Sequence, residues 1–156
     1  MKLLVVGALG AGKTTVARHL RSTLPVVVDL DDELVRLNGG VYPDITTRRT
    51  VVAPLALAGV AALPEVVVLH STLDPDDVRA LRAAGFATAL LEVSEAELRR
   101  RHAVRLDEEG WSNEAWLADN LALVDTLRQQ RLLDHVIDAE RDPAAVAADL
   151  VRLANG

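Results

Sequence analysis

Eight residues near the start of the chain have the types and spacing of a phosphate-binding loop. The segment GALGAGKT, residues 7–14, fits the pattern GxxxxGK[ST] and lies between an apolar run and a helix-like sequence, as this motif requires. Its glycines allow backbone conformations that turn several N–H groups inward, and the N-terminus of the following helix adds a partial positive charge. The segment therefore predicts a cradle for a chain of phosphates.

Side chains of the same segment would complete a site for ATP and Mg²⁺. Lys13 would reach the outer phosphates, Thr14 would give its hydroxyl to the magnesium ion, and Thr15 would hydrogen-bond the innermost phosphate. The chain has only two lysines, Lys2 and Lys13, among many arginines, so a lysine here indicates a need for a compact ammonium group. The predicted nucleotide-binding residues are Gly7, Gly10, Ala11, Gly12, Lys13, Thr14 and Thr15.

Three carboxylates follow the second apolar run, in the sequence VVVDLDDEL. Asp29 and Asp31 lie two residues apart, so in an extended segment they would point the same way. Either one could face the magnesium ion and the terminal phosphate, while the other accepts the proton of an acceptor hydroxyl. Alternatively, Asp31 or Asp32 would cap a helix that begins near Glu33.

A helix-like segment rich in arginine follows the fourth apolar run. Arg101 and Arg105 lie four residues apart and share a helix face, from which guanidinium groups could neutralise a transferred phosphoryl group. We expect a lid at about residues 101–117, flanked by Trp111 and Trp116, of which Trp116 would pack in the core. Arg99 and Arg100 would instead form weak surface pairs with the acids of residues 95–97.

Other polar residues have two open interpretations. Arg48 and Arg49 would either hold an acidic or phosphorylated acceptor or begin a solvated helix. His70 ends the third apolar run, where it would be catalytic or structural. His102 shares a helix face with apolar residues at four-residue spacing, which predicts a buried structural histidine.

Five short apolar runs must position these residues. They cover residues 3–6, 26–30, 66–69, 87–93 and 135–137, and each is followed by a helix-like sequence. Their continuous hydrophobicity indicates strands that are buried on both faces, hence a mainly parallel five-stranded sheet with helices on both sides. We predict one three-layer α/β domain over residues 1–156, with loops at residues 38–47 and 107–113. Asp74, Ser94 and Asp142 mark helix starts.

Composition excludes several classes of protein and site. The net charge of −6 leaves no basic excess for a general affinity for nucleic acid, and the absence of cysteine excludes disulfides and thiolate metal sites. The apolar stretch at residues 51–69 is interrupted by proline, glycine and glutamate, so a buried helix and strand fit it better than a membrane span. No signal-peptide pattern follows Met1, so we expect a cytoplasmic protein. We expect it to be a monomer or a homodimer.

The absence of other motifs narrows the class of nucleotide-binding protein. No NKxD-like guanine reader is present, and the one DxxG match, residues 107–110, follows a helix-like sequence, which argues against a switch GTPase. The third apolar run ends in His70-Ser71-Thr72 rather than in adjacent acids, which argues against motor and AAA-type ATPases. Phosphate transfer to a small molecule fits the remaining residues better.

The order GALGAGKTT, then DLD, then an arginine-rich helix resembles the P-loop small-molecule kinases, namely the shikimate kinase, gluconate kinase and nucleotide kinase group. It also resembles the looser group of AAA-type zeta-toxin and polynucleotide-kinase-like small kinases. The resemblance implies an ATP-dependent transfer of the γ-phosphate to a hydroxyl of a small metabolite or nucleotide. It places magnesium binding on Thr14 and Asp29, the acceptor hydroxyl on Asp31, and adenine near residues 138–143.

The sequence departs from that of shikimate kinases in two features, and two other functions are alternatives to small-molecule phosphotransfer. The glycine pair after the third strand and the FR..E segment of shikimate kinases are absent, so shikimate itself is not the expected acceptor. A nucleotide sensor or simple ATPase would share the phosphate-binding loop without transferring phosphate to an acceptor. A polynucleotide-end kinase is a further alternative, which the acidic charge disfavours.

Overall fold

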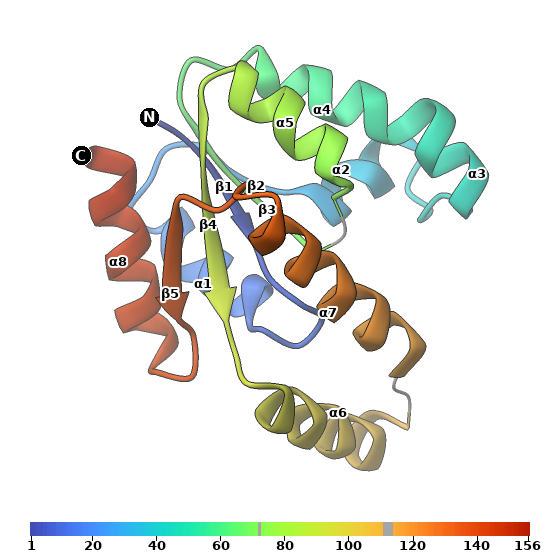
Figure 1. Cartoon of the computed structure of the whole chain (residues 1–156). Coiled ribbons are helices and arrows are strands. Elements are labelled where there is room, and N and C mark those ends of the chain that lie inside the picture. Colours follow the sequence, from blue (N-terminus) through green and yellow to red (C-terminus); the bar gives the residue numbers. More distant parts are fainter. Residues whose placement is uncertain (72, 111–113) are drawn as a thin grey trace.

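The computed structural model describes residues 1–71, 73–110 and 114–156, and in these residues five strands form one parallel sheet (Figure 1). The strand order is β2-β3-β1-β4-β5, and every pairing is parallel. The strands are β1 (Lys2–Val6), β2 (Val27–Asp29), β3 (Val66–His70), β4 (Phe86–Glu92) and β5 (His135–Asp138). The predicted sheet is therefore confirmed, with each strand within two residues of its apolar run.

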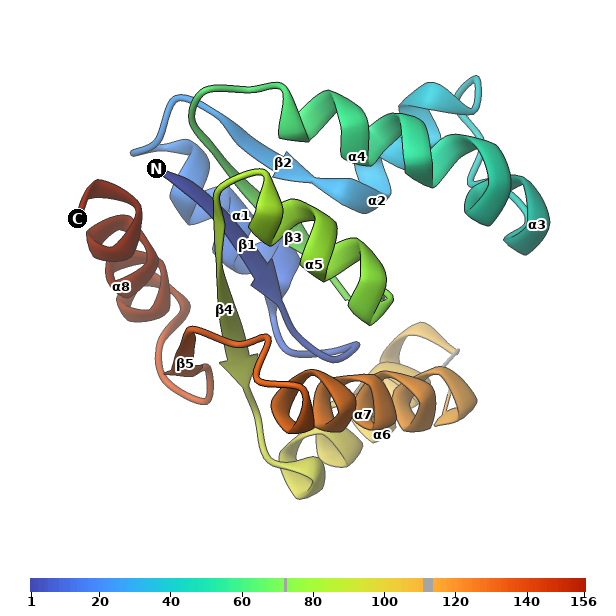
Figure 2. The same cartoon turned by 45° about the horizontal axis from the view of Figure 1, so that its top comes forward.

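Helices connect the strands in the expected alternation. They are α1 (Lys13–Arg21), α2 (Leu30–Leu37), α3 (Ile45–Thr47), the π-helical turn η1 (Arg48–Val52), α4 (Ala53–Ala61), α5 (Pro75–Ala83), α6 (Glu95–Glu109), α7 (Glu114–Gln129) and α8 (Pro143–Asn155). α6 and α7 lie beyond the carboxyl end of β4, and α2 and α3 extend from the same end of the sheet (Figures 1 and 2). The chain thus places two helical segments around the edge where parallel strands present ligand sites.

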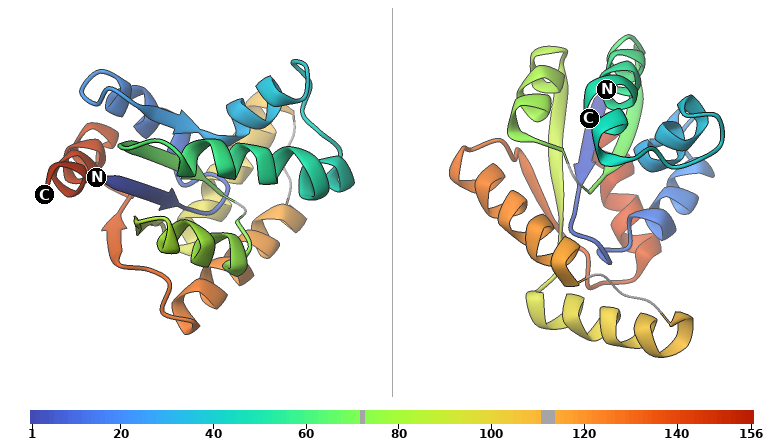
Figure 3. Two further views of the ribbon diagram at one scale, coloured as in Figure 1. Left: turned by 90° about the horizontal axis from the view of Figure 1, so that it is seen from above. Right: turned by 90° about the vertical axis from the view of Figure 1, so that its right-hand side faces the viewer.

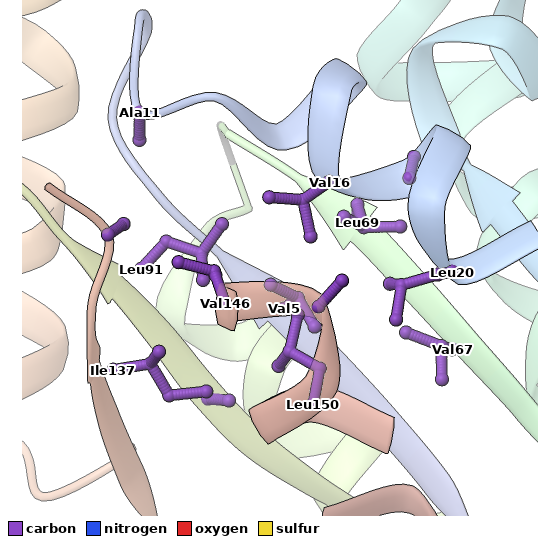
Figure 4. Packing of buried hydrophobic residues seen from close by; sticks show 14 of the residues in the cluster. Val5, Ala11, Val16, Leu20, Val67, Leu69, Leu91, Ile137, Val146 and Leu150 are labelled. Carbon is purple, nitrogen blue, oxygen red and sulfur yellow. The ribbon is translucent and has the colours of Figure 1, made fainter. Parts of the chain in front are cut away.

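The sheet separates two apolar clusters, which makes the three layers (Figure 3). Alternate residues of β1 point to opposite faces, so Leu3 and Val5 join one cluster while Leu4 and Val6 join the other. The first cluster packs under α1 and α8, where Figure 4 shows Val16 and Leu20 beside the strand residues. The second packs under α2, α4, α5 and α7. Burial on both faces explains why β1, β3 and β4 read as continuous apolar runs, whereas the edge strands β2 and β5 are only partly buried.

The predicted helix starts are confirmed. Ser94 accepts a hydrogen bond from the N–H of Glu97 at 3.2 Å, and Asp142 accepts one from Ala144 at 2.8 Å. Asp74 occupies the N-cap of α5 without a side-chain hydrogen bond. The side chains of Ser94 and Asp142 thus satisfy backbone N–H groups that a helix start leaves without an intrahelical acceptor.

Three sequence-based predictions are wrong in detail. The predicted loop at residues 38–47 ends early, because Asp44 caps α3 by accepting from Thr46 and Thr47. The predicted loop at residues 107–113 begins late, because α6 continues to Glu109. Trp116 is 57% exposed and does not pack in the core. Trp111, the other predicted flank of the lid, lies outside the described residues.

Within the described ranges, no helix combines the length and the apolar character that a membrane crossing requires. The apolar stretch at residues 51–69 forms parts of η1 and β3 and the whole of α4. The strand is buried as predicted, whereas α4 buries only Ala56 and Val60 and is not a buried helix.

Candidate active site

The phosphate-binding loop, residues 7–14, runs from the end of β1 to the second residue of α1, as the motif predicts. Gly12 precedes α1 with φ of 90° and ψ of 15°, a left-handed conformation that glycine adopts readily. Gly7 lies so close to its surroundings that an added Cβ would come within 3.2 Å of Ala11 Cβ and 3.3 Å of Leu91 Cβ. The left-handed backbone therefore favours glycine at Gly12, and close packing leaves little room for a side chain at Gly7.

Lys13 folds back onto its own loop. Its Nζ donates to the carbonyl oxygens of Gly7 at 2.7 Å and Ala8 at 2.9 Å. Burial lowers the pKa of the Lys13 ammonium to about 8, the carboxylates of Asp31 and Asp29 oppose this shift, and the charge of Arg105 adds to it. The lysine thus lies within electrostatic reach of both predicted carboxylates and of one predicted arginine.

The tip of the loop is held by the two helices after β4. The N–H of Leu9 donates to Asn120 Oδ1 at 2.8 Å, and His102 Nε2 donates to the Leu9 carbonyl oxygen at 3.1 Å. Arg101 Nη1 donates to the carbonyl oxygen of Gly10 at 3.0 Å and its Nε to Glu97 at 3.0 Å. His102 is buried as predicted, and Arg101 contacts the loop, whereas the role of Asn120 was not predicted.

One feature of the sequence could have indicated the role of Asn120. It is a single amide on the otherwise apolar buried stripe of α7, together with Leu117, Val124 and Leu127. A buried polar side chain needs a hydrogen-bond partner, so such an interruption indicates a specific contact. Its partner Leu9 is 111 residues away, and no local pattern identifies it.

The carboxylates after β2 are arranged differently from the extended segment expected. α2 begins at Leu30, so Asp29 is its N-cap and accepts the N–H of Asp31 at 3.0 Å, while Asp31 already lies in the first helical turn. The prediction that Asp31 or Asp32 caps a helix starting near Glu33 is wrong for the same reason. Burial raises the pKa of Asp29, and the neighbouring charges of Asp32 and Asp31 raise it further against its backbone hydrogen bonds.

Asp31 belongs to a polar cluster of four residues from different elements. Tyr42 Oη donates to Asp31 Oδ1 at 3.3 Å, and His70 Nδ1 lies 3.6 Å from the same oxygen. On its other side, His70 Nε2 lies 3.2 Å from Arg48 Nη2. Burial lowers the pKa of His70 to about 3, and the positive charges of Arg48 and Lys13 add to this shift, so the ring is neutral.

The other predicted arginines have unequal positions. Arg99 and Arg100 pair with Glu95 and Glu97 on the exposed side of α6, as predicted. Arg105 is half-buried and lies 3.7 Å from Glu109. Arg49 is exposed on η1, beside Arg48.

A cleft of about 300 Å³ adjoins the loop. One wall is the loop and α1, a second is α6 with Arg101 and Arg105, and a third is the segment after β5 that was expected to hold adenine. The residues that line it are Gly10, Ala11, Gly12, Thr15, Val16, Arg101, His102, Arg105, Ala139, Arg141, Pro143 and Val146. The loop, the arginines and residues 138–143 therefore meet in one cavity.

The donor set fits a magnesium ion that shares its ligands with a nucleotide. In the part of the chain that the structure describes, no three acidic or histidine side chains gather as a metal cage. Mg²⁺ in nucleotide sites takes one or two protein oxygens and completes its shell with phosphate oxygens and water. Thr14, the second residue of α1, and Asp29, at the end of β2, are the predicted protein donors.

Comparisons with known proteins agree on the fold. The chain resembles a gluconokinase from Sinorhizobium meliloti (22% identity, 99% of this chain and 94% of that one, TM-score 0.69). It also resembles a shikimate kinase from Acinetobacter baumannii solved with shikimate (21% identity, 97% and 91%, TM-score 0.72). A tunicamycin resistance protein from Deinococcus radiodurans has the same fold (22% identity, 98% and 95%, TM-score 0.62). No curated protein sequence matches the chain significantly.

A family model identifies the chain's relatives. Residues 3–128 match the family described as AAA domain. This match and the small kinases among the solved structures confirm the expected resemblance to the P-loop kinase group, which included AAA-type small kinases. The argument from the sequence against AAA-type ATPases was therefore too broad. The chain has the fold of the P-loop kinase group and belongs to the AAA domain family.

Proposed function

We propose that this protein is an ATP- and Mg²⁺-dependent phosphotransferase that moves the γ-phosphate to a hydroxyl group of a small metabolite or nucleotide. One observation carries the proposal. The ammonium of Lys13 lies within electrostatic reach of the carboxylates of Asp31 and Asp29 and of the Arg105 guanidinium. Phosphoryl transfer depends mainly on such positioning of charges around the transferred group.

The nucleotide would occupy the cleft. The N–H groups of the loop would hold the phosphates, and Lys13 would leave its carbonyl contacts to bind the outer phosphates. Thr14 and Asp29 would hold Mg²⁺, which supplies positive charge against the phosphate oxygens. The base would lie against residues 138–143, where Ala139 and Pro143 offer an apolar surface.

Asp31 would act on the acceptor. The acceptor oxygen attacks the γ-phosphorus and forms a new O–P bond, while the bond from that phosphorus to the β–γ bridging oxygen breaks and ADP leaves. The hydroxyl proton passes to the Asp31 carboxylate. Arg101 and Arg105 would neutralise the charge on the transferred group from α6, and a lid at about residues 101–117 would exclude water.

Arg48 and Arg49 would hold an acidic or phosphorylated part of the acceptor. Both lie on η1, and Arg48 contacts His70 beside Asp31. The proposal further takes the chain as one cytoplasmic domain, monomeric or homodimeric, with no nucleic acid partner.

The test is ADP release from ATP and Mg²⁺ with pools of sugars, nucleosides and hydroxy acids. We expect one pool to accelerate release by the unaltered protein, and Lys13→Met to abolish that acceleration. Asp31→Asn should retain ATP binding and lose about 10²-fold or more in turnover, because a general base contributes roughly that factor. Asp32→Asn is the matched control, since this exposed neighbour pairs with Arg21, and it should turn over normally.

Two results would count against the proposal. Full turnover by Asp31→Asn would remove Asp31 from the base role. ADP release that no pool accelerates would instead support a simple ATPase or a nucleotide sensor.

A further inference from the structure

His70 occupies a position that the proposed reaction does not yet use. It is the last residue of β3, 3% exposed, and its imidazole lies between a guanidinium and a carboxylate. Nε2 is 3.2 Å from Arg48 Nη2, and Nδ1 is 3.6 Å from Asp31 Oδ1. The ring therefore lies between η1 and the first turn of α2.

The guanidinium fixes which ring nitrogen carries the proton. Arginine has only donors, so Nε2 of His70 must be the acceptor and holds a lone pair toward Arg48. In the neutral imidazole the single proton is then on Nδ1, the nitrogen that faces Asp31. The low pKa of His70, about 3, agrees with a neutral ring over the physiological range.

Both neighbours of the Asp31 carboxylate lie at the same oxygen. Tyr42 Oη donates to Oδ1, and His70 Nδ1 lies nearest to the same oxygen, at 3.6 Å, just beyond hydrogen-bond length. Among the described residues, no hydrogen bond reaches Oδ2. Oδ1 is thus hydrogen-bonded by Tyr42 and faces the ring of His70, and Oδ2 is left for the acceptor.

We propose that His70 is a positioning residue: its Nδ1–H, set by Arg48, orients the Asp31 carboxylate so that Oδ2 meets the acceptor hydroxyl. This inference rests on the proposed phosphotransfer and deepens it. A neutral donor orients the carboxylate without forming the full ion pair that an imidazolium would form. Arg48 has further N–H groups, so its contact with His70 leaves donors for an acidic acceptor.

The tautomer can be measured without any substrate. In ¹⁵N-labelled protein the long-range ¹H–¹⁵N spectrum separates the two neutral tautomers of each of the four histidines, and His70 is assigned by substitution. We expect the Nδ1–H form at neutral pH, and Arg48→Met should shift the ring toward the Nε2–H form. An Nε2–H ring or an imidazolium in the unaltered protein, or an unchanged ring in Arg48→Met, would overturn the inference.

Two substitutions separate the contacts of the ring kinetically. Asparagine places an amide N–H near the position of Nδ1, and glutamine places its amide near the position of Nε2. With the acceptor found in the pool screen, His70→Asn should stay within about fivefold of normal turnover, whereas His70→Gln should lose about 10²-fold in kcat, the scale of a roughly 1 Å misplacement. ATP affinity should be unchanged in both.

The outcomes distinguish the inference from the proposed function. Equal kcat for the two variants, or a change confined to KM, would overturn the positioning role while leaving phosphotransfer intact. If no pool accelerates ADP release by the unaltered protein, the proposed function fails and the positioning role fails with it, whatever the tautomer. If neither His70 variant folds, the unaltered protein and Arg48→Met still decide the result through the ring spectrum, because Arg48 is only half-buried.

Discussion

Replacing Gly12 by alanine tests the loop conformation through stability. Gly12 has φ of 90° and ψ of 15°, and an added Cβ would meet no atom within 4 Å. Steric contact therefore adds nothing, and the cost is the backbone strain of an L-residue in the left-handed region, about 1–2 kcal/mol. We expect the free energy of unfolding to fall by that amount.

Gly59→Ala is the matched control. Gly59 lies within α4, is exposed, and also has no atom within 4 Å of an added Cβ. There the same chemical change should raise the free energy of unfolding by about 0.5–1 kcal/mol, because alanine favours a helix interior over glycine. The two variants should then differ by roughly 2 kcal/mol, with opposite signs relative to the unaltered protein.

Urea denaturation measures both values, and each 1 kcal/mol should move the thermal midpoint by about 2–4 °C in a domain of this size. ATP binding should weaken in Gly12→Ala and stay unchanged in Gly59→Ala. If Gly12→Ala were as stable as Gly59→Ala, the left-handed conformation of the loop would be refuted.

Three further predictions follow from the site and its supports. Lys13, with a pKa of about 8, should be about three-quarters neutral at pH 8.5, and ATP should raise its pKa. Binding of ATP should therefore take up a proton near pH 8.5, and the affinity for ATP should fall as the pH rises above 8. Calorimetry in buffers of different ionisation enthalpy measures this proton uptake, and finding no uptake would contradict the prediction. Asn120→Leu leaves the Leu9 N–H without its acceptor, so the protein should lose about 1–3 kcal/mol and some ATP affinity; unaltered nucleotide titrations would argue against the role of α7. Asp134→Ala removes the acceptor of the Thr88 N–H at 2.8 Å and the partner of Arg82, so urea unfolding should show a loss of about 1–2 kcal/mol with no change in ATP binding.

The sequence predicted the sheet and the phosphate-binding loop because both depend on local signals. Apolar runs identify buried parallel strands, and GxxxxGK[ST] specifies a backbone shape through its glycines. The start of α2 was predicted wrongly because it depends on where β2 stops, and β2 is only three residues long, ending where Asp29 pairs with Leu69 of β3. The residues around Asp29 do not indicate where β2 stops pairing with β3.

Contacts between distant residues account for the remaining differences. Trp116 was expected in the core, but it lies beside the buried stripe of α7 that begins at Leu117, and the helix turns it outward. The cluster of Tyr42, Asp31 and His70 unites three segments, so no spacing along the chain predicts it. Side-chain types indicated these residues as candidates; only the fold shows which of them meet.

The attachment of Leu9 to Asn120 also bears on how the protein is made. The tip of the phosphate-binding motif is secured by a residue 111 positions later in the chain. During synthesis β1 and α1 leave the ribosome before α7, so the loop lacks this anchor until α7 has emerged. The tip of the loop is therefore held in this arrangement only once α7 has docked, although the motif precedes α7 in the chain.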